Sequence, residues 1–168
     1  SAAEINKLDG LSASTTELDY NDVTTLGTVQ TSKTVTADAS GIVNHADYVV
    51  QRPEIKDYAE TVNAIGSIGG GTQDIDVTAG NVVTGTVDTS TTTFTFSNPS
   101  ATGKCCSFTL ILTNAGSQTV NWPASVDWSG GTEPTLTTSG IDVFGFLTLD
   151  AGTIWYGFAG GLDMKTPS

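Results

Sequence analysis

Few side chains in this sequence are suited to catalysis. His45 is the one histidine, and it stands in the stretch VNHADYVV. A hydrolytic triad needs a nucleophile and an orienting acid next to the imidazole, and the sequence does not place Ser40 or Asp47 in those roles. We therefore interpret His45 as a surface or interface residue, and we predict no catalytic residue in the chain.

Carboxylates are numerous but dispersed along the chain. Asp74 and Asp76 share one face of a predicted strand, and Asp127 and Glu133 flank a glycine-containing loop. Paired acids hydrolyse glycosides in some enzymes and bind calcium in other proteins, but this Asp-x-Asp lacks the rest of a calcium loop. We interpret the acids as residues that keep the outer sides of strands soluble, and we predict neither a metal site nor a cofactor.

Two further motifs are structural rather than catalytic. Cys105 and Cys106 are adjacent, so in a strand they point to opposite faces, and no zinc-binding spacing exists. We expect one buried and one half-exposed thiol; a vicinal or intermolecular disulfide is the alternative. The stretch GSIGGGTQD (66–74) leads into a strand, whereas phosphate loops lead from a strand into a helix, so we interpret it as a linker.

Two tryptophans flank a turn in VNWPASVDWSGGTEP (120–134). Aromatic faces on loops form platforms for sugar rings or for another protein, but the same side chains could instead plug the end of a β domain. The candidate receptor-binding residues are Trp122, Asp127, Trp128 and Glu133.

The charge of the chain excludes some partners. The 168 residues include 18 acidic and 6 basic ones, which gives a net charge of −12. The basic residues are scattered singly, so we expect no nucleic-acid partner, because such binding depends on clustered Lys and Arg. No apolar run approaches the ~20 residues that span a bilayer, so we expect a soluble chain without membrane insertion. The chain shows no export signal and begins at Ser1 without Met, so we expect a processed or recombinant fragment.

The N-terminal part, 1–52, is predicted to be a fibrous segment with short helix-turn units. AEINKLDG (3–10) and TELDYNDV (16–23) form a weak duplication, and Ser14 to Glu17 fits a capping box. Helices this short are marginal in water on their own, so these units need a neighbouring element to pack against. The composition also changes along the chain. It holds 29 Thr and 15 Ser, and all of its Phe and Trp residues lie beyond Gly71.

Residues 53–71 are predicted to be a short coiled-coil helix with a glycine linker. Pro53 and Glu54 suit a helix start, and Gly66 suits its end. Apolar residues follow at spacings of 3, 4 and 3, which is the a/d pattern of a coiled coil. The stripe either packs on its own domain or clamps several copies together; the trimer-interface residues would then be Ile55, Tyr58, Val62 and Ile65.

The C-terminal part, 72–168, is predicted to be an all-β domain, an antiparallel, jelly-roll-like β-sandwich, which makes the chain mainly β. Short alternating segments are separated by turn clusters, as in sandwiches and barrels. The predicted strands are 73–79, 81–88, 91–97, 107–113, 118–122, 134–138, 141–150 and 153–160. Phenylalanines two residues apart, such as Phe94 with Phe96 and Phe144 with Phe146, share a face and are expected to supply the core.

Long stretches of the chain resemble fibre proteins of tailed bacteriophages, especially those of marine and cyanobacterial hosts. The opening AAEINKLDGLSASTTELDYNDV resembles their short helix-turn units. Their carboxy-terminal module is similar to EIKDYAETVNAIGSIGGGTQDIDV, GNVVTGTVDTSTTTFTFSNP, SFTLILTNAGSQTVNWPASVDWSGGTEPTL and TIWYGFAG. The resemblance implies a virion structural protein in a tail or head fibre, a homotrimer with a slender shaft and a β-rich end.

Two functions are compatible with that resemblance. The first is host attachment, in which the fibre tip binds a cell-surface receptor such as a polysaccharide without catalysis. The second is a structural role as a fibre, decoration or connector protein that contacts other virion proteins only. A polysaccharide depolymerase is a third hypothesis, but it needs two carboxylates at a defined separation in a groove, and the β domain is small for that.

Overall fold

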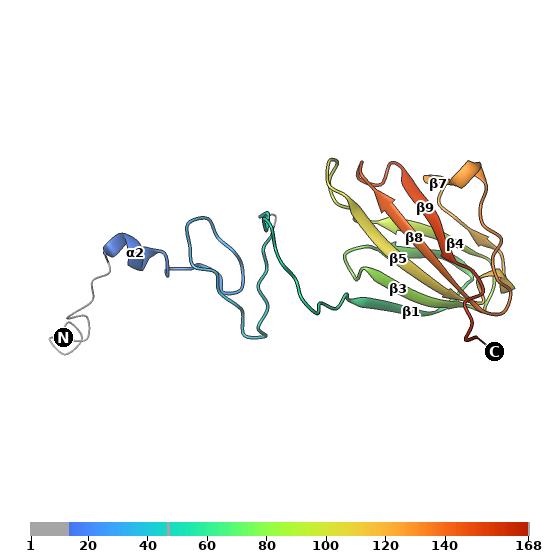
Figure 1. The fold of residues 1–168 in the computed structure, drawn as a ribbon, viewed down its shortest axis with the longest axis horizontal. Helices are drawn as coiled ribbons and strands as arrows, with labels where there is room; N and C mark the ends of the chain where they lie inside the picture. Colours follow the sequence, from blue (N-terminus) through green and yellow to red (C-terminus); the bar gives the residue numbers. More distant parts are fainter. Residues whose placement is uncertain (1–13, 47, 168) are drawn as a thin grey trace. The chain divides into compact units, whose positions relative to one another are not determined.

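A computed structural model describes residues 14–46 and 48–167 (Figure 1). The contacts divide the chain into two compact units, Ser1–Lys56 and Asp57–Ser168. The boundary predicted near Gly71 therefore falls inside the second unit. We describe each unit by itself.

One short helix opens the described part of the first unit. Helix α2 spans Thr15–Asp19, and Ser14 is its N-cap. The Glu17 amide donates to Ser14 Oγ at 3.2 Å, and the Ser14 amide donates to Glu17 Oε2 at 2.7 Å. These two bonds form the predicted capping box. The Ser14 amide, followed by the Ser14 hydroxyl, donates to the Glu17 carboxylate and holds the pKa of Glu17 below its ordinary value. The companion unit predicted at 3–10 lies outside the described residues.

The rest of the first unit is irregular chain held by turns. Asp38 accepts hydrogen bonds from the amides of Ser40 and Ile42 at 2.8 and 2.9 Å, which closes a turn at Asp38-Ala39-Ser40-Gly41. A single parallel bridge joins Thr28 to Asn44. These contacts are all local or polar.

The first unit has no hydrophobic core among its described residues. Between 14 and 56 Gly27 is the one buried residue that the structure describes. Large apolar side chains are exposed throughout; Val49 is 88% and Leu26 62% exposed. The others are Leu18, Tyr20, Val35, Ile42, Val43, Tyr48, Val50 and Ile55. Burial within the unit therefore does not account for its stability.

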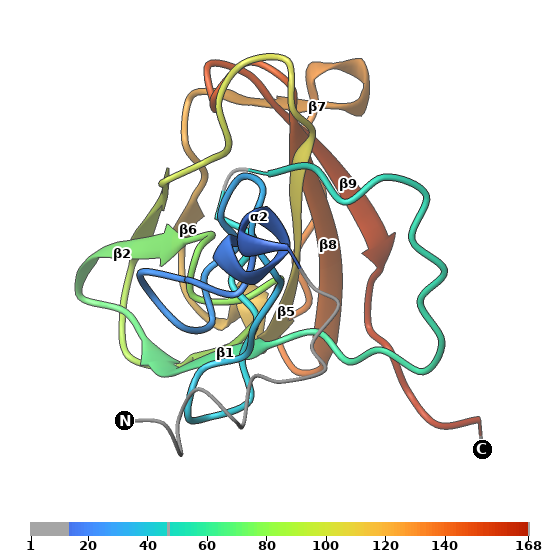
Figure 2. The same ribbon diagram turned by 90° about the vertical axis from the view of Figure 1, so that its left-hand side faces the viewer.

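The second unit is built from two β-sheets, so the described chain is mainly β. The strands are β1 (Val62–Ile68), β2 (Gly71–Asp76), β3 (Val82–Val87), β4 (Thr92–Ser97), β5 (Cys106–Thr113), β6 (Val120–Asn121), β7 (Val126–Trp128), β8 (Ile141–Thr148) and β9 (Trp155–Gly161), with 3₁₀ turns η1 (Ala115–Ser117) and η2 (Ser129–Gly131). One sheet has the order β1-β3-β5-β8-β9-β7, and the other has the order β2-β4-β6. Figure 2 shows β2 and β6 on one side of the unit and β8 and β9 on the other.

The first six strands alternate between the two sheets. β1, β3 and β5 are parallel neighbours in the larger sheet, and β2, β4 and β6 are parallel neighbours in the smaller one. The chain thus coils through three successive turns, and each turn adds one strand to each sheet. The antiparallel neighbours β8 and β9 then extend the larger sheet beside β5.

A tight passage carries the chain from β1 to β2 at Gly69. Its φ of 147° and the position of Ser90, whose amide nitrogen lies 2.5 Å from where a Cβ would be, exclude any side chain there. Gly69 therefore lets the first turn of the coil approach the second.

The predicted antiparallel pairing is wrong for most of the sheet. Five of the seven strand pairs that the structure describes are parallel. The turn residues and the alternating side chains indicated where each strand begins and ends. These signals are the same whether the next strand returns beside the previous one or crosses to the other sheet. The predicted strand at 134–138 is irregular, and β7 is a strand that was not predicted.

The helix and the glycine linker predicted over 53–71 are also wrong, because Gly66 lies inside β1 and Gly71 begins β2. Residues 53–61 are irregular, Asp57 has a φ of 57°, and Val62–Ile68 is strand β1. A helix here would be short and marginal by itself, whereas β1 pairs with β3, Ile68 is fully buried in the core and Ile65 packs against it. The coiled-coil stripe therefore does not exist within this chain.

An aromatic core joins the two sheets. Phe96 of β4 contacts Phe108, Phe146 and Trp155 of the larger sheet, with ring centroids 5.0, 5.0 and 5.3 Å away. Phe94, also on β4, is fully buried and stacks on Trp122 at 5.5 Å. The predicted phenylalanine pairs do supply the core, with Leu110 and Leu112 fully buried beside them.

We expect Phe96→Ala to lower the free energy of unfolding by about 3 kcal/mol, because it removes an apolar ring from a packed interior. Urea denaturation followed by tryptophan fluorescence measures the change. Thr93→Ala, on the exposed side of the same strand, should stay within about 0.5 kcal/mol of the parent chain. Equal losses for both variants would contradict the role of Phe96 in joining the sheets.

The turn between β8 and β9 is organised by one carboxylate. Asp150 Oδ1 accepts hydrogen bonds from Thr148 Oγ1 at 2.9 Å and from the Ile154 amide at 3.0 Å. Thr148 is fully buried, and its hydroxyl also accepts from the Gly152 amide at 3.0 Å. The Ile154 amide, followed by the Thr148 hydroxyl, holds the pKa of Asp150 below its ordinary value.

This lowered pKa predicts a pH-dependent contribution to stability. A depressed folded-state pKa stabilises the fold above the ordinary aspartate value of about 3.9, and that contribution is lost as the pH falls through the folded value. We expect Asp150→Ala to lower the melting temperature at pH 7 and the difference from the parent chain to shrink below about pH 4. Asp127→Ala, at an exposed acid, is the control. A difference that is equal at pH 7 and pH 3 would show that the Asp150 charge contributes nothing.

Candidate functional site

The structure brings the predicted receptor-binding residues together in one open pocket. Trp122, Asp127, Trp128 and Glu133 all line it, and its volume is about 580 Å³. Pro123, Ala124, Val126 and Gly131 complete the lining. We call this the Trp–acid pocket.

Strand β6 and the following turn place Trp122 at the base of the pocket. Val120 and Trp122 are each 8% exposed, whereas Asn121 between them is exposed, as the alternation of a strand requires. The Trp122 ring lies among core aromatics, 5.3 Å from the ring of Phe144. Trp122 is thus mainly a hydrophobic plug, the alternative that the sequence left open.

Strand β7 presents Asp127 and Trp128 to opposite sides. β7 pairs in parallel with β9, so that Trp128 is opposite Gly157. A Cβ at Gly157 would lie 2.8 Å from Trp128 Cζ3, so the indole rests on bare backbone. Its ring is 5.3 Å from Trp122 in an edge-to-face arrangement. Gly157 is a site residue that the sequence analysis missed; its signal is a glycine at an inward position of a predicted strand.

Trp128 also carries the one buried side-chain nitrogen or oxygen that has no hydrogen-bond partner among the described residues. Its Nε1–H is inaccessible to solvent and donates to no acceptor among the described residues. Leaving such a donor unpaired costs about 1–3 kcal/mol. A small rotation of the half-buried ring that gave the N–H an acceptor would recover this free energy.

The carboxylates give the pocket a negative charge. Asp127 and Glu133 are both exposed, and the one ion pair within the described residues joins Lys165 to Asp163, with an N–O distance of 2.6 Å. The glycines of η2 reverse the chain between β7 and Glu133; Gly130 and Gly131 have φ angles of 65° and 69°. The pocket therefore suits hydroxyl groups or cations and disfavours phosphates and other anions.

The predicted trimer-interface residues do not form one group. Ile55 and Tyr58 are 65% and 68% exposed on irregular backbone, and Val62 is 56% exposed at the start of β1. Ile65 instead packs partly buried against the core of its own unit. The spacing that predicted a shared stripe has no helix to act through.

The remaining candidates gain little from the structure. Cys105 is exposed and Cys106 is half-buried at the start of β5, so both are more exposed than predicted. Asp74 accepts from Thr95 at 2.7 Å on the outer side of the smaller sheet. The described residues hold no group of three or more His, Cys, Asp or Glu that could bind a metal ion. No described helix is long and apolar enough to cross a bilayer.

The two kinds of pocket residue should respond differently to substitution. We expect Trp122→Ala to lower the free energy of unfolding by about 3–5 kcal/mol, because it opens a cavity in the core. The double variant Asp127→Asn, Glu133→Gln should stay within about 0.5 kcal/mol of the parent chain, since both side chains are exposed. Urea denaturation compares them. A large loss in the double variant would mean that the acids support the fold rather than a ligand.

No protein-family model, curated protein or solved structure matches this chain.

Proposed function

We propose that this chain is a homotrimeric fibre protein of a tailed-bacteriophage virion, and that its second unit, which holds the two β-sheets, attaches the virion to a host-surface glycan. The observation that carries the proposal is the Trp–acid pocket, in which two carboxylates and an indole surround an open hollow. No catalytic step is part of the proposal. Other virion proteins would hold the fibre at its opposite end.

The chemistry of the pocket selects a kind of glycan. Carboxylates accept hydrogen bonds from sugar hydroxyls, and bonds to charged groups are the stronger ones. Asp127 and Glu133 have no cationic partner among the described residues, so an acidic polysaccharide would be repelled. A neutral sugar or one that carries an amino group fits better. If Trp128 turns toward the hollow, its unpaired N–H could donate to a sugar oxygen.

The trimer is supported by the first unit. Its exposed apolar side chains, from Leu18 to Ile55, are not packed into a core within the described part of that unit. Association with identical copies would remove these side chains from water. Three copies would also present three pockets, and multivalent binding raises avidity well above the affinity of one site.

Adsorption competition tests the attachment function. The purified full chain should bind cells of the phage's host and compete with the virion for adsorption. Asp127→Asn, Glu133→Gln should weaken cell binding roughly 10-fold or more, because each lost charged hydrogen bond is worth about 1.5–3 kcal/mol. Asp74→Asn, Asp88→Asn removes the same charge from other exposed positions and is the matched control.

An array of neutral, amino-bearing and acidic saccharides identifies the ligand class in the same experiment. Binding confined to acidic saccharides would contradict the charge argument. An intact oligomer that neither binds cells nor competes would reject attachment and favour the second function, a structural fibre, decoration or connector protein.

A further inference from the structure

The outer side of the larger sheet carries no charge across four of its strands. β3, β5 and β9 contain no charged residue, and the single one in β8, Asp142, is fully buried on the inner side. The outward positions instead hold hydroxyl, aliphatic and aromatic side chains and glycine. Examples are Thr109, Ile111, Val143, Leu147, Tyr156 and Phe158. We call this surface the neutral face.

The smaller sheet shows the opposite pattern. Its outward positions are polar, and two of them are acidic: Asp74 and Asp76. Asp74 accepts hydrogen bonds from Thr95 and Ser97 of the neighbouring strand, at 2.7 and 2.5 Å. These carboxylates are solvated or satisfied within the sheet. In a chain with a net charge of −12, the absence of acids from the outward positions of β3, β5, β8 and β9 is therefore a distinguishing feature.

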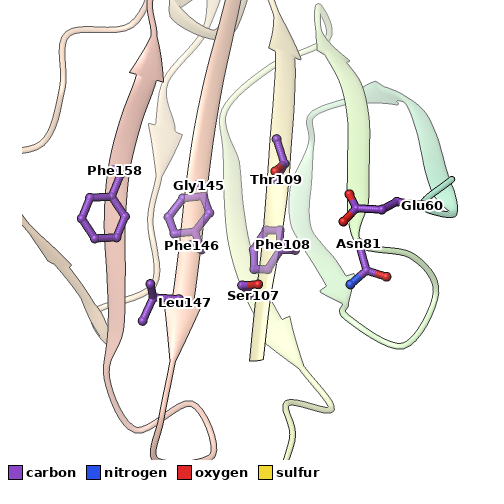
Figure 3. A pocket seen from close by; sticks show the side chains of 9 residues that line it. All are labelled: Glu60, Asn81, Ser107, Phe108, Thr109, Gly145, Phe146, Leu147 and Phe158. Atoms are coloured by element: carbon purple, nitrogen blue, oxygen red, sulfur yellow. The ribbon is translucent and has the colours of Figure 1, made fainter. Parts of the chain in front are cut away.

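A hollow with a volume of about 220 Å³ lies in the neutral face (Figure 3). Gly145 forms part of its lining, and nothing lies within 4 Å of where a Gly145 Cβ would be. Phe158, which is opposite Gly145 on β9, stands beside the hollow and is 55% exposed. Thr109 lines it from β5, and Glu60 is the one charged residue of its lining. The face thus has both a raised aromatic ring and a recess.

We infer that the neutral face is where copies of this chain meet. Two copies that approached through their acidic surfaces would repel one another, whereas this face lets them approach without juxtaposing carboxylates at its centre. A basic partner would be drawn to the acidic surfaces instead, so a second copy is the occupant that the charges favour. The inference rests on the proposed function for the number of copies, which is three.

The size of the face sets the strength of this contact. Four strands about 4.8 Å apart and up to eight residues long, at about 3.4 Å each, cover roughly 500 Å². A standard interface takes about 800 Å² from each partner. The neutral face alone therefore supports association that depends on protein concentration.

Sedimentation of the full chain over a wide concentration range tests the inference. The parent chain should associate above its monomer mass of 17.3 kDa. Thr109→Lys places a charge at the centre of the face and should weaken association roughly 10-fold or more, because like charges across an interface cost several kcal/mol. Gly145→Leu, at a position where an added Cβ would have no atom within 4 Å, places a side chain in the hollow and should also weaken it. Thr72→Lys, with the same charge change on the outer side of the smaller sheet, should not.

Circular dichroism confirms that each variant is folded. A parent chain that stays monomeric at every concentration would overturn both this inference and the proposed homotrimer. A parent chain that associates, with Thr109→Lys and Gly145→Leu associating equally well, would overturn the neutral face alone. Host-cell binding by the same preparations reports on the attachment function separately.

Discussion

The packing of aromatic rings between the two sheets is the constraint on which the second unit depends. The smaller sheet has only three strands, and one of them is two residues long, so it could not persist in water by itself. Phe96 attaches it to the larger sheet through three ring contacts, with centroid distances of 5.0 to 5.3 Å. Trp122 belongs to the same cluster, so the base of the Trp–acid pocket is part of the core. The interior therefore fixes the base of the pocket, while its two acids are exposed.

The sequence predicted the strands much better than it predicted their partners. Phenylalanines at a spacing of two mark a buried strand face, because side chains alternate across a sheet. Which sheet a strand joins depends on contacts across the core that no local pattern encodes. A comparison of VNAIGSI with VVTGTV could have indicated the coil, since these segments pair in parallel with Gly66 opposite Gly85. The spacing of Ile55, Tyr58, Val62 and Ile65 fitted a helix, but pairing with β3 overrode it.

The candidate site was predictable by residue type and not by geometry. Trp and carboxylate residues close together in a turn-rich segment pointed to a binding surface, and the structure places these residues around one pocket. The division of labour between the tryptophans was not predictable, because it depends on Gly157 in a strand that is distant in sequence. The surface of the second unit thus has three chemically different regions. Acids and an indole line the pocket, hydroxyls and acids cover the smaller sheet, and the larger sheet carries an uncharged face.

The first turn of the coil of parallel strands leaves two strand edges unpaired. β1 and β2 come from the same turn of the chain, and each is the outermost strand of its sheet. The unpaired backbone groups on their outer edges could pair with the strands of one further turn of the coil. That turn would need an inserted segment about as long as the one that separates Val62 from its partner Val82, and it would lengthen both sheets without altering the pocket. The same groups could also recruit strands from other molecules. The bulge at Ile65 and the acids of β2 oppose such recruitment, which leaves the unit extensible by evolution and resistant to aggregation.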